Sequence, residues 1–349
     1  MGRQRRRLRI AGFTLVGALV LGAGGAGWTF WRLNDNIRSV DIDAALGDNR
    51  PAKTGPTTSA DPSDPSDPSA SPSALPSALP SGALNILVLG SDSRSGTENA
   101  ELGGGDDGAG ARSDTAMVVH IDEGRTGATV VSIPRDTLVT RPSCPLESGG
   151  SSSVAYNAMF NSAYAVGGPV CAVKTVESMT HVRMDHYIEI DFSGFAQLVD
   201  ALGGVTVTTD EDIDDDDSHL ELTAGTHHLD GEKALALART RHGIGDGSDL
   251  GRIGLQQTLV KALLDQISST DLLTDPTRLY EAADAITGSL TTDTGVDSLT
   301  ELMKLGQSLK GLSSDTTKTV MMPVVTAPYD GNRVVADEPE ASELWESLK

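Results

Sequence analysis

Arginine and aspartate occur together at the ends of three predicted strands. Continuous apolar runs at residues 85–90, 116–121 and 129–133 are typical of strands buried on both faces. A single arginine–aspartate pair is usually a surface salt bridge. Polar side chains at the ends of several strands in an α/β domain, however, gather at one edge of the sheet. We therefore expect one shared polar site. The residues concerned are Asp92, Arg94, Arg112, Asp114, Arg135 and Asp136.

Further arginines lie along two predicted helices. The first helix ends near Arg239 and Arg241, and the second carries Arg252 and Gln256 on one face at spacing i, i+4. Arginine at the end of a helix can also be explained by the helix macrodipole. Six of the 18 basic residues after position 82 are nevertheless arginines in these motifs. In so acidic a segment this concentration indicates an anion-binding pocket, because a guanidinium binds phosphate oxygens bidentately.

The carboxylates suggest a metal ion. Asp92 and Asp114 lie next to arginines and are expected to bind a hard divalent cation, Mg2+ (or Mn2+). The serines of these motifs have no histidine partner at a motif position, so a nucleophile is not apparent. Phosphoryl transfer needs mainly charge neutralisation and an aligned acceptor, which fits this residue set. Asp114 or Asp136 is the candidate general base.

The charge of the chain excludes one class of partner. The whole protein carries −22, and the part after residue 82 carries −24. That part should be repelled by nucleic acid and by anionic lipid. The acidic stretch 210–217 lacks the glycine and the final glutamate of an EF-hand loop, so we expect a solvated loop there.

The two cysteines, Cys144 and Cys171, fit no metal-binding spacing. An oxidising compartment would allow them to form a disulfide. Closing a loop of this length would stabilise the folded state by roughly 3–4 kcal/mol. The alternative is two buried free thiols. The disulfide is the preferred interpretation because the N-terminus indicates export.

The N-terminus predicts a membrane anchor. Residues 1–9 contain five arginines, and residues 10–31 are uncharged and long enough to span a bilayer core. The positive flank places the N-terminus in the cytoplasm and the rest of the chain outside the cell membrane. A cleaved signal peptide is the alternative, although its apolar core would normally be shorter.

Residues 32–83 are expected to be a linker outside the membrane, because prolines recur every three or four residues over much of this stretch. Such a linker would hold the folded part away from the membrane. Strands alternating with helices then predict an α/β domain at 84–328, a three-layer α/β/α sandwich with a mixed central sheet. Residues 329–349 are expected to be a C-terminal tail with a short helix.

These motifs together resemble the LytR-CpsA-Psr family of cell-wall phosphotransferases, in the actinobacterial type. Seven stretches match in the family's order over residues 84–328. They are NILVLGSDSR, RSDT, SIPRD, NSAYAVGG, FAQLVDALGGV, LDGEKALALARTR and DLGRIGLQQ. Leu255 departs from the family pattern, in which an arginine is common at that step, and residues 95–111 are a glycine-rich insertion.

The resemblance implies a chemistry for these residues. Arg135, Arg239, Arg241 and Arg252, together with Arg94 and Arg112, would surround the pyrophosphate of a polyprenyl (undecaprenyl) carrier whose lipid chain lies in an apolar pocket. Asp92 and Asp114 would position Mg2+. The reaction would transfer a glycan phosphate to the muramic acid 6-hydroxyl of peptidoglycan. The alternatives are hydrolysis of the pyrophosphate, or a non-catalytic glycolipid-binding or regulatory protein.

Overall fold

The computed structural model describes residues 30–48, 50–53, 82–91, 113–146, 148–241, 249–269 and 276–349. Among these residues, no helix is sufficiently long and apolar to cross a membrane. The predicted membrane helix lies outside the described residues except for its last two positions, and residues 54–81 of the predicted linker also lie outside them. Both features stay predictions.

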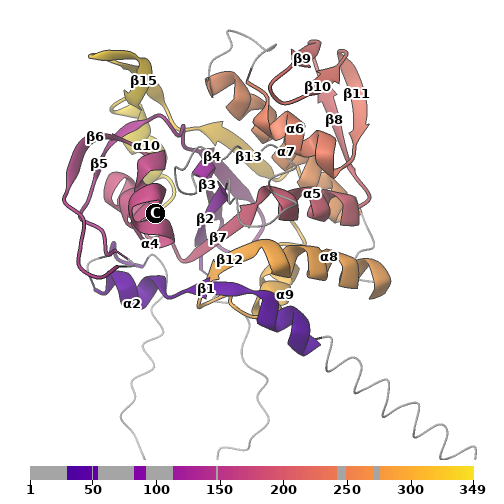
Figure 1. The fold of residues 1–349 in the computed structure, drawn as a ribbon, viewed down its shortest axis with the longest axis horizontal. Helices are drawn as coiled ribbons and strands as arrows, with labels where there is room; N and C mark the ends of the chain where they lie inside the picture. The colour runs from indigo at the N-terminus through magenta and orange to yellow at the C-terminus, as the bar shows by residue number, and fades with distance from the viewer. Residues whose placement is uncertain are drawn as a thin grey trace, which may run out of the picture.

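A seven-stranded mixed sheet forms the centre of the molecule (Figure 1). Its strands are, in spatial order, β1 (Arg38–Val40), β12 (Leu290–Asp293), β7 (His186–Asp191), β2 (Leu84–Ser91), β3 (Ser113–Ile121), β4 (Ala128–Ser132) and β13 (Thr317–Met321). β2 pairs parallel with β7 and antiparallel with β3, and β4 pairs parallel with β13. The apolar runs of the sequence therefore form the sheet centre, as predicted, whereas the two strands at the β1 edge were not expected.

Helices cover both faces of this sheet, because successive strand residues point to opposite sides. Leu87 and Leu89 of β2 pack in one core with α4 (Asn161–Thr180), α2 (Ile42–Leu46) and α10 (Glu340–Glu346). Ile86 and Val88 pack in another core with α9 (Leu299–Ser308). Figure 1 shows α4 and α10 on one side of the sheet and α8 (Pro276–Ser289) and α9 on the other.

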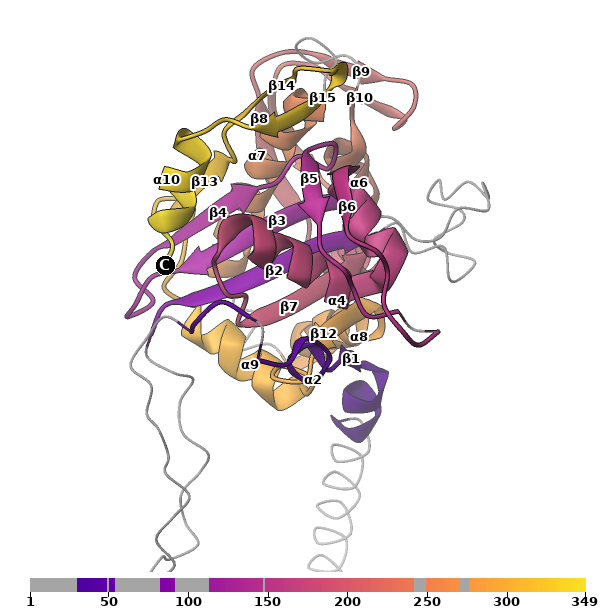
Figure 2. The ribbon, with the colours of Figure 1, turned by 90° about the vertical axis from the view of Figure 1, so that its left-hand side faces the viewer.

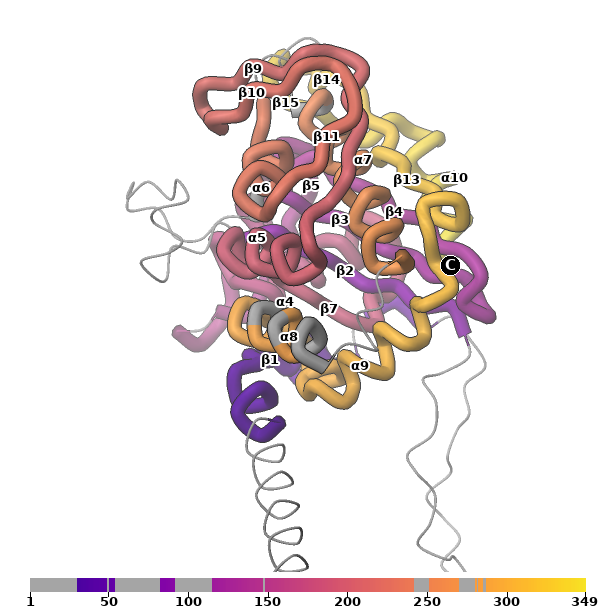
Figure 3. The backbone as a smooth tube through the Cα atoms, turned by 90° about the vertical axis from the view of Figure 1, so that its right-hand side faces the viewer, coloured from indigo at the N-terminus to yellow at the C-terminus, as the bar shows by residue number. Residues whose placement is uncertain are grey.

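A third core lies among the elements that carry the predicted anion site. It joins α5 (Phe192–Ala201), α6 (Gly231–Arg239) and α7 (Asp249–Ser269) to a hairpin of β8 (Val205–Thr209) and β11 (Gly225–Leu229). Gly203 and Gly204 follow α5 with φ of 84° and 89°, which confirms the predicted end of that helix. Figure 3 shows the three helices side by side.

The described residues also form three smaller hairpins. They are β5 (Leu138–Arg141) with β6 (Ala155–Met159), β9 (Ile213–Asp215) with β10 (Leu220–Leu222), and β14 (Val324–Ala327) with β15 (Asp330–Ala336). The first of these leads directly into α4.

The structure joins Cys144 to Cys171 in a disulfide, which confirms the preferred interpretation. Their Cα atoms lie 5.2 Å apart, and both residues are fully buried. The disulfide region also explains why residue 167 is a glycine. A Cβ at this position would lie only 2.9 Å from Cys171 Cβ and from the Pro145 carbonyl oxygen. The helix predicted to open at Pro169 is the second, regular part of α4, after a kink at the glycines.

The folded unit extends beyond the expected limits of 84 and 328. At one end β1 belongs to the central sheet, although it lies inside the predicted linker. At the other end Trp345 and Leu348 are buried in the same core as α4. The tail is therefore part of the domain, because its short helix supplies apolar side chains that cover one face of the sheet.

Candidate functional site

The predicted strand-end site is at one edge of the central sheet. β2, β4 and β7 are oriented alike, so their carboxyl ends lie at the same edge, and the antiparallel β3 begins there. The register places Ser91 opposite both Ser113 and Asp191. In Figure 2 the strands run across the view in sheet order from β1 at the bottom to β13 at the top.

A pocket of about 240 Å³ opens at this edge between the strands and the helices α5, α6 and α7. Four of the predicted site residues line it together: Arg239, Arg241, Arg252 and Gln256. The other lining residues are Thr115, Phe192, Asp217, Ser218, Leu235 and Ala238. The pocket therefore combines several guanidinium groups with a few apolar side chains.

Arg239 lies on the last turn of α6. The helix begins where the Asp230 carboxylate accepts a hydrogen bond from Lys233 N (2.9 Å), as its sequence predicted. The Arg239 guanidinium carbon lies 5.2 Å from the centre of the Phe192 ring, a cation–π distance. Phe192 opens α5 directly after β7, so this contact joins the helix to the edge of the sheet.

Arg241 is positioned by an aspartate that the sequence analysis had assigned to a solvated loop. Asp215 is only 2% exposed, and its carboxylate accepts hydrogen bonds from Arg241 N (2.7 Å) and Asp217 N (3.0 Å). The expectation for stretch 210–217 is therefore wrong at this residue. The hairpin β9–β10 buries Asp215 under the pocket, while Asp214 and Asp216 remain exposed.

Helix α7 closes the pocket from the side of β3. Gln256 is buried, and its amide donates to Thr115 Oγ1 (2.9 Å) and to the Ala238 carbonyl oxygen (3.0 Å). Arg252, one turn earlier, is 4% exposed. The predicted i, i+4 face of this helix thus joins the sheet edge to α6. Leu255, the departure from the family pattern, packs against the third core.

The proposed metal ligands are only partly placed by the structure. Asp92, Arg94 and Arg112 lie outside the described residues, and the side chain of Asp114 does too. The backbone of Asp114 is the extra residue of a β-bulge, because Gly90 pairs with Thr115 and Ser91 with Ser113. Bulges commonly occur next to active sites. Among the described residues, no cluster of three or more histidine, cysteine, aspartate or glutamate side chains is arranged to bind a metal.

The backbone is consistent with a paired-carboxylate metal site. Asp92 directly follows Ser91, and Asp114 directly follows the register partner of Ser91. Two carboxylates are a donor set that Mg2+ accepts, with water and substrate oxygens completing the shell. The chemistry of the two aspartates therefore fits the ion, and their role as metal ligands stays a prediction.

Arg135 is not among the residues that line this pocket. It follows β4 and is partly buried, with its Nε atom 3.9 Å from a carboxylate oxygen of Asp136. The same oxygen lies 3.7 Å from Arg333. Ser132, at the end of β4, is 3.5 Å from the amide nitrogen of Gln257 on α7. Arg135 therefore lies beyond the same sheet edge, and its role in substrate binding stays a prediction.

A buried carboxylate lies just inside this edge and was not foreseen. Glu189 of β7 is 6% exposed and accepts hydrogen bonds from the hydroxyl groups of Tyr164 (2.6 Å) and Tyr187. Burial, together with Glu189, raises the pKa of Tyr187 well above its usual value. The contact ties the first turn of α4 to the sheet.

Comparisons with known proteins show which family this chain resembles. Residues 33–349 match the model of the LytR_cpsA_psr family. The probable cell wall biosynthesis protein LcpB of Corynebacterium glutamicum is 36% identical over 273 residues, which cover 76% of this chain and 61% of the relative. TagV of Bacillus subtilis, a polyisoprenyl-teichoic acid–peptidoglycan teichoic acid transferase, is 31% identical over 67% of this chain and 57% of the relative.

Solved structures give the same relationship. The crystal structure of B. subtilis TagV matches with a TM-score of 0.58 and 26% identity, covering 77% of this chain and 97% of the other. TagT bound to LI-WTA matches with a TM-score of 0.56 and 25% identity, covering 76% and 89%. The chain spans about three fifths of the length of LcpB and TagV. On the family match and the shared fold, this chain belongs to the LytR-CpsA-Psr family.

Proposed function

We propose that this protein is an Mg2+-dependent enzyme that transfers a glycan phosphate from a polyprenyl (undecaprenyl) pyrophosphate carrier to peptidoglycan. The observation that carries the proposal is the pocket in which Arg239, Arg241 and Arg252 meet at the carboxyl edge of the sheet. The name of TagV and the ligand of TagT support the same class of reaction. An acidic protein that collects arginines in one pocket is suited to a polyanionic substrate.

In the proposed reaction the arginines bind the diphosphate oxygens of the donor. The muramic acid 6-hydroxyl of the acceptor attacks the phosphorus next to the sugar. A new oxygen–phosphorus bond forms, the bond to the bridging oxygen breaks, and the carrier leaves as its monophosphate. Asp114 or Asp136 would accept the proton of the incoming hydroxyl. The guanidinium groups offset negative charge throughout, which is the main requirement of phosphoryl transfer.

Asp92 and Asp114 are the residues that would hold Mg2+ (or Mn2+), and the bound ion would neutralise part of the diphosphate charge. The donor's lipid chain would enter beside Phe192 and Leu235, the larger apolar residues of the pocket. A longer apolar channel for the polyprenyl chain stays a prediction. Because Leu255 stands where an arginine is common in the family, the positive charge of the site would come from the arginines that line the pocket.

We further propose that residues 10–31 anchor the protein in the cell membrane, with the N-terminus in the cytoplasm and the folded domain outside. The uncharged run and the five arginines before it support this arrangement. The disulfide also supports it, because disulfides persist in oxidising compartments.

A product analysis tests the function. The purified protein is given a lipid-linked glycan, Mg2+ and peptidoglycan fragments, and the products are identified by mass spectrometry. The proposal predicts a glycan joined to peptidoglycan through one phosphate, together with polyprenyl monophosphate, and loss of both on chelation of the metal. Release of glycan phosphate without a joined product would indicate hydrolysis. Tight donor binding with no turnover at any Mg2+ concentration would indicate a non-catalytic glycolipid-binding protein.

A further inference from the structure

The first part of the predicted linker, which precedes the Pro/Ser-rich residues 54–81, is bound to the folded domain. Leu33, within a helix at residues 30–36, is 4% exposed. The side-chain oxygen of Asn34 accepts a hydrogen bond from Leu299 N at the start of α9 (3.1 Å). Directly afterwards, β1 pairs in parallel with β12, so this segment forms the edge strand of the central sheet.

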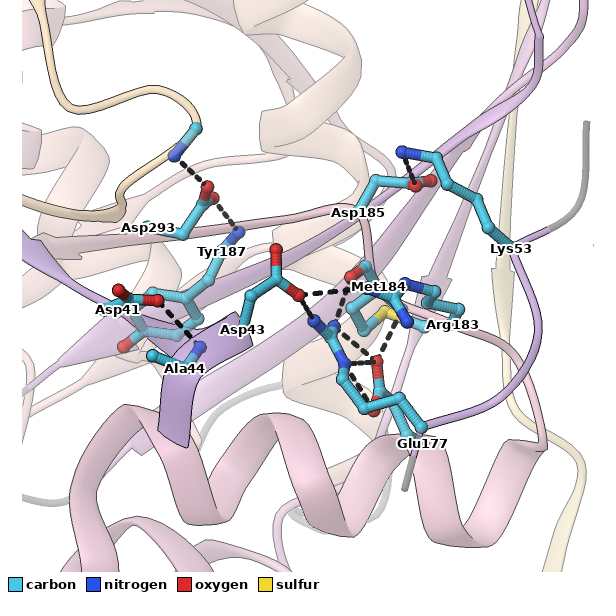
Figure 4. Close-up of polar contacts among 12 residues, drawn as sticks. Asp41, Asp43, Ala44, Lys53, Glu177, Arg183, Met184, Asp185, Tyr187 and Asp293 are labelled. Carbon is cyan, nitrogen blue, oxygen red and sulfur yellow. Dashed lines mark hydrogen bonds and ion pairs between the residues drawn. The ribbon is translucent and has the colours of Figure 1, made fainter. Parts of the chain in front are cut away.

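A buried ion pair fixes the same segment further along (Figure 4). Arg50 Nε lies 3.1 Å from each carboxylate oxygen of Glu177, and Arg50 also donates to the Met184 carbonyl oxygen (2.6 Å). Both charged side chains are only 4% exposed. Asp43 contacts Arg50 and lies 2.9 Å from Arg183. We call Asp43, Arg50, Glu177 and Arg183 the clasp. Burial lowers the pKa of Arg50, but Glu177 and Asp43 more than offset this and raise it, so the arginine stays charged.

The two ends of the Pro/Ser tract, residues 54–81, meet at one residue. Lys53 Nζ lies 3.1 Å from one carboxylate oxygen of Asp185, and Asn85 N donates to the other at 3.0 Å. Asp185 N also donates to the Asn85 carbonyl oxygen (2.7 Å). The tract therefore leaves the domain and returns to it at the same place, at the sheet edge opposite the pocket. It adds no length between residue 31 and the domain.

The position of the Pro/Ser tract changes the expected distance between the N-terminal segment and the pocket. A Pro-rich spacer of residues 54–81 in polyproline II conformation would extend up to about 90 Å. Without it, the distance from the N-terminal segment to the pocket is set by folded elements. Thr115 on β3 is four strands from β1, or about 19 Å at the usual strand separation. The helix at 30–36 adds about 10 Å.

We infer that the folded domain rests directly on the lipid bilayer with its β1 edge toward the membrane, and that the Pro/Ser tract is an excursion from the domain, not a spacer. The N-terminal segment would hold the domain there against the repulsion expected between its negative charge and anionic lipid. Phe30 and Trp31, which are 45% and 63% exposed, would then lie in the headgroup layer, where aromatic side chains are favoured. The arrangement holds the pocket at a fixed height over the surface that supplies a lipid-borne diphosphate. The consequence for turnover depends on the proposed function and on the predicted membrane helix.

Three variants of the full-length protein in lipid vesicles test this inference. In the first, a flexible Gly-Ser segment of about ten residues, with a mean reach of about 17 Å, is inserted before Phe30. The matched control carries the same segment after Ser66, within the tract, and a third variant lacks residues 57–78. A fluorophore replaces Tyr329, which is 99% exposed on the turn between β14 and β15, and energy transfer to labelled lipid headgroups reports the height of the domain.

We expect energy transfer to fall only for the insertion before Phe30. Turnover of a membrane-embedded lipid-linked glycan should fall several-fold in that variant alone, because the site samples a larger volume above the membrane. With the same donor dispersed in detergent, all variants should be equal. A change in energy transfer for either tract variant as large as that for the first insertion would overturn the inference. If the energy transfer behaves as expected but no variant turns over the donor, the inference stands and the proposed function fails.

Discussion

Arginine side chains are grouped in two regions of this molecule, and their surroundings differ. In the clasp, the Arg50 guanidinium is enclosed by protein oxygens, and its carboxylate partner Glu177 is equally buried. In the pocket, three arginines line a cavity of about 240 Å³. The first arrangement pairs opposite charges inside the fold, and the second presents positive charge to the open space of a pocket.

The difference shows that arginines grouped in sequence motifs can be recognised as a site, whereas an isolated structural arginine cannot. The pocket arginines belong to short motifs, and their concentration in an otherwise acidic segment predicted a common site. Arg50 belongs to no motif, and its partners Glu177 and Met184 lie more than a hundred positions away in the sequence. Binding arginines and structural arginines should therefore respond differently to the same substitution.

The largest effect is expected in the clasp. Arg50→Ala leaves Glu177 buried without its charged partner, which should lower the free energy of unfolding by about 3–5 kcal/mol. Chemical denaturation of the purified domain measures this. The matched control is Arg183→Ala, because Arg183 pairs with the exposed Asp43 and should cost at most about 1 kcal/mol. Equal losses in the two variants would show that the buried pair is not a special anchor.

In the pocket, substitution should affect rate and not folding. Arg239→Ala is expected to lower turnover about 10²- to 10³-fold, the cost of removing one group that stabilises charge in the transition state. The melting temperature should stay close to that of the wild type. Lys233→Ala, on the exposed side of the same helix, serves as the control and should retain full activity. Full activity of the Arg239 variant would remove the proposed site.

A smaller effect, on both folding and substrate binding, is expected at Asp215. Its carboxylate is buried in the fold and also positions Arg241 of the pocket. Asp215→Asn keeps the shape but weakens the hydrogen bond to Arg241 N, so unfolding should become easier by about 1–2 kcal/mol. Because Arg241 would be held less firmly, KM for the lipid-linked donor should rise more than kcat falls. Asp214→Asn, exposed on the same strand, should change neither quantity. Identical behaviour of both variants would contradict a positioning role for Asp215.

The smallest effect concerns pH. His120 is 7% exposed and hydrogen-bonds to Asn85, and burial lowers its pKa below the usual 6.5, although Asp122 and Asp185 act in the opposite direction. Below pH 6.5 the unfolded chain binds a proton at His120 more readily than the folded chain does. The contribution of this histidine to stability is therefore complete above pH 6.5 and decreases as the pH falls. His120→Gln should therefore lose less stability than the wild type between about pH 7.5 and about pH 5.5 in urea unfolding. An unchanged pH dependence would contradict the assignment.

Much of the fold could be predicted from local pattern. The central strands are continuous apolar runs, the helix at α6 begins at the predicted Asp230 cap, and α5 ends at the Gly203–Gly204 pair. That Arg239, Arg241, Arg252 and Gln256 share one pocket was predicted from the concentration of arginines in short motifs of an acidic segment, and not from the strand-end rule.

The features that were missed depend on distant contacts. β1 and β12 are three and four residues long and partly polar, so neither has a recognisable period. Asp215 stands in a run of acidic residues, and only the hairpin distinguishes it from its exposed neighbours. Phe192 could not be separated from an ordinary core aromatic, because its partner Arg239 is recognised only once the helices pack.

The central claim is that the arginine pocket binds a lipid-borne diphosphate. Calorimetric titration with a water-soluble, short-chain prenyl diphosphate in the presence of Mg2+ tests it most directly. We predict one binding site per chain in the wild type, affinity that decreases with salt, and loss of binding in Arg239→Ala but not in Lys233→Ala. Undiminished binding in Arg239→Ala would contradict the account.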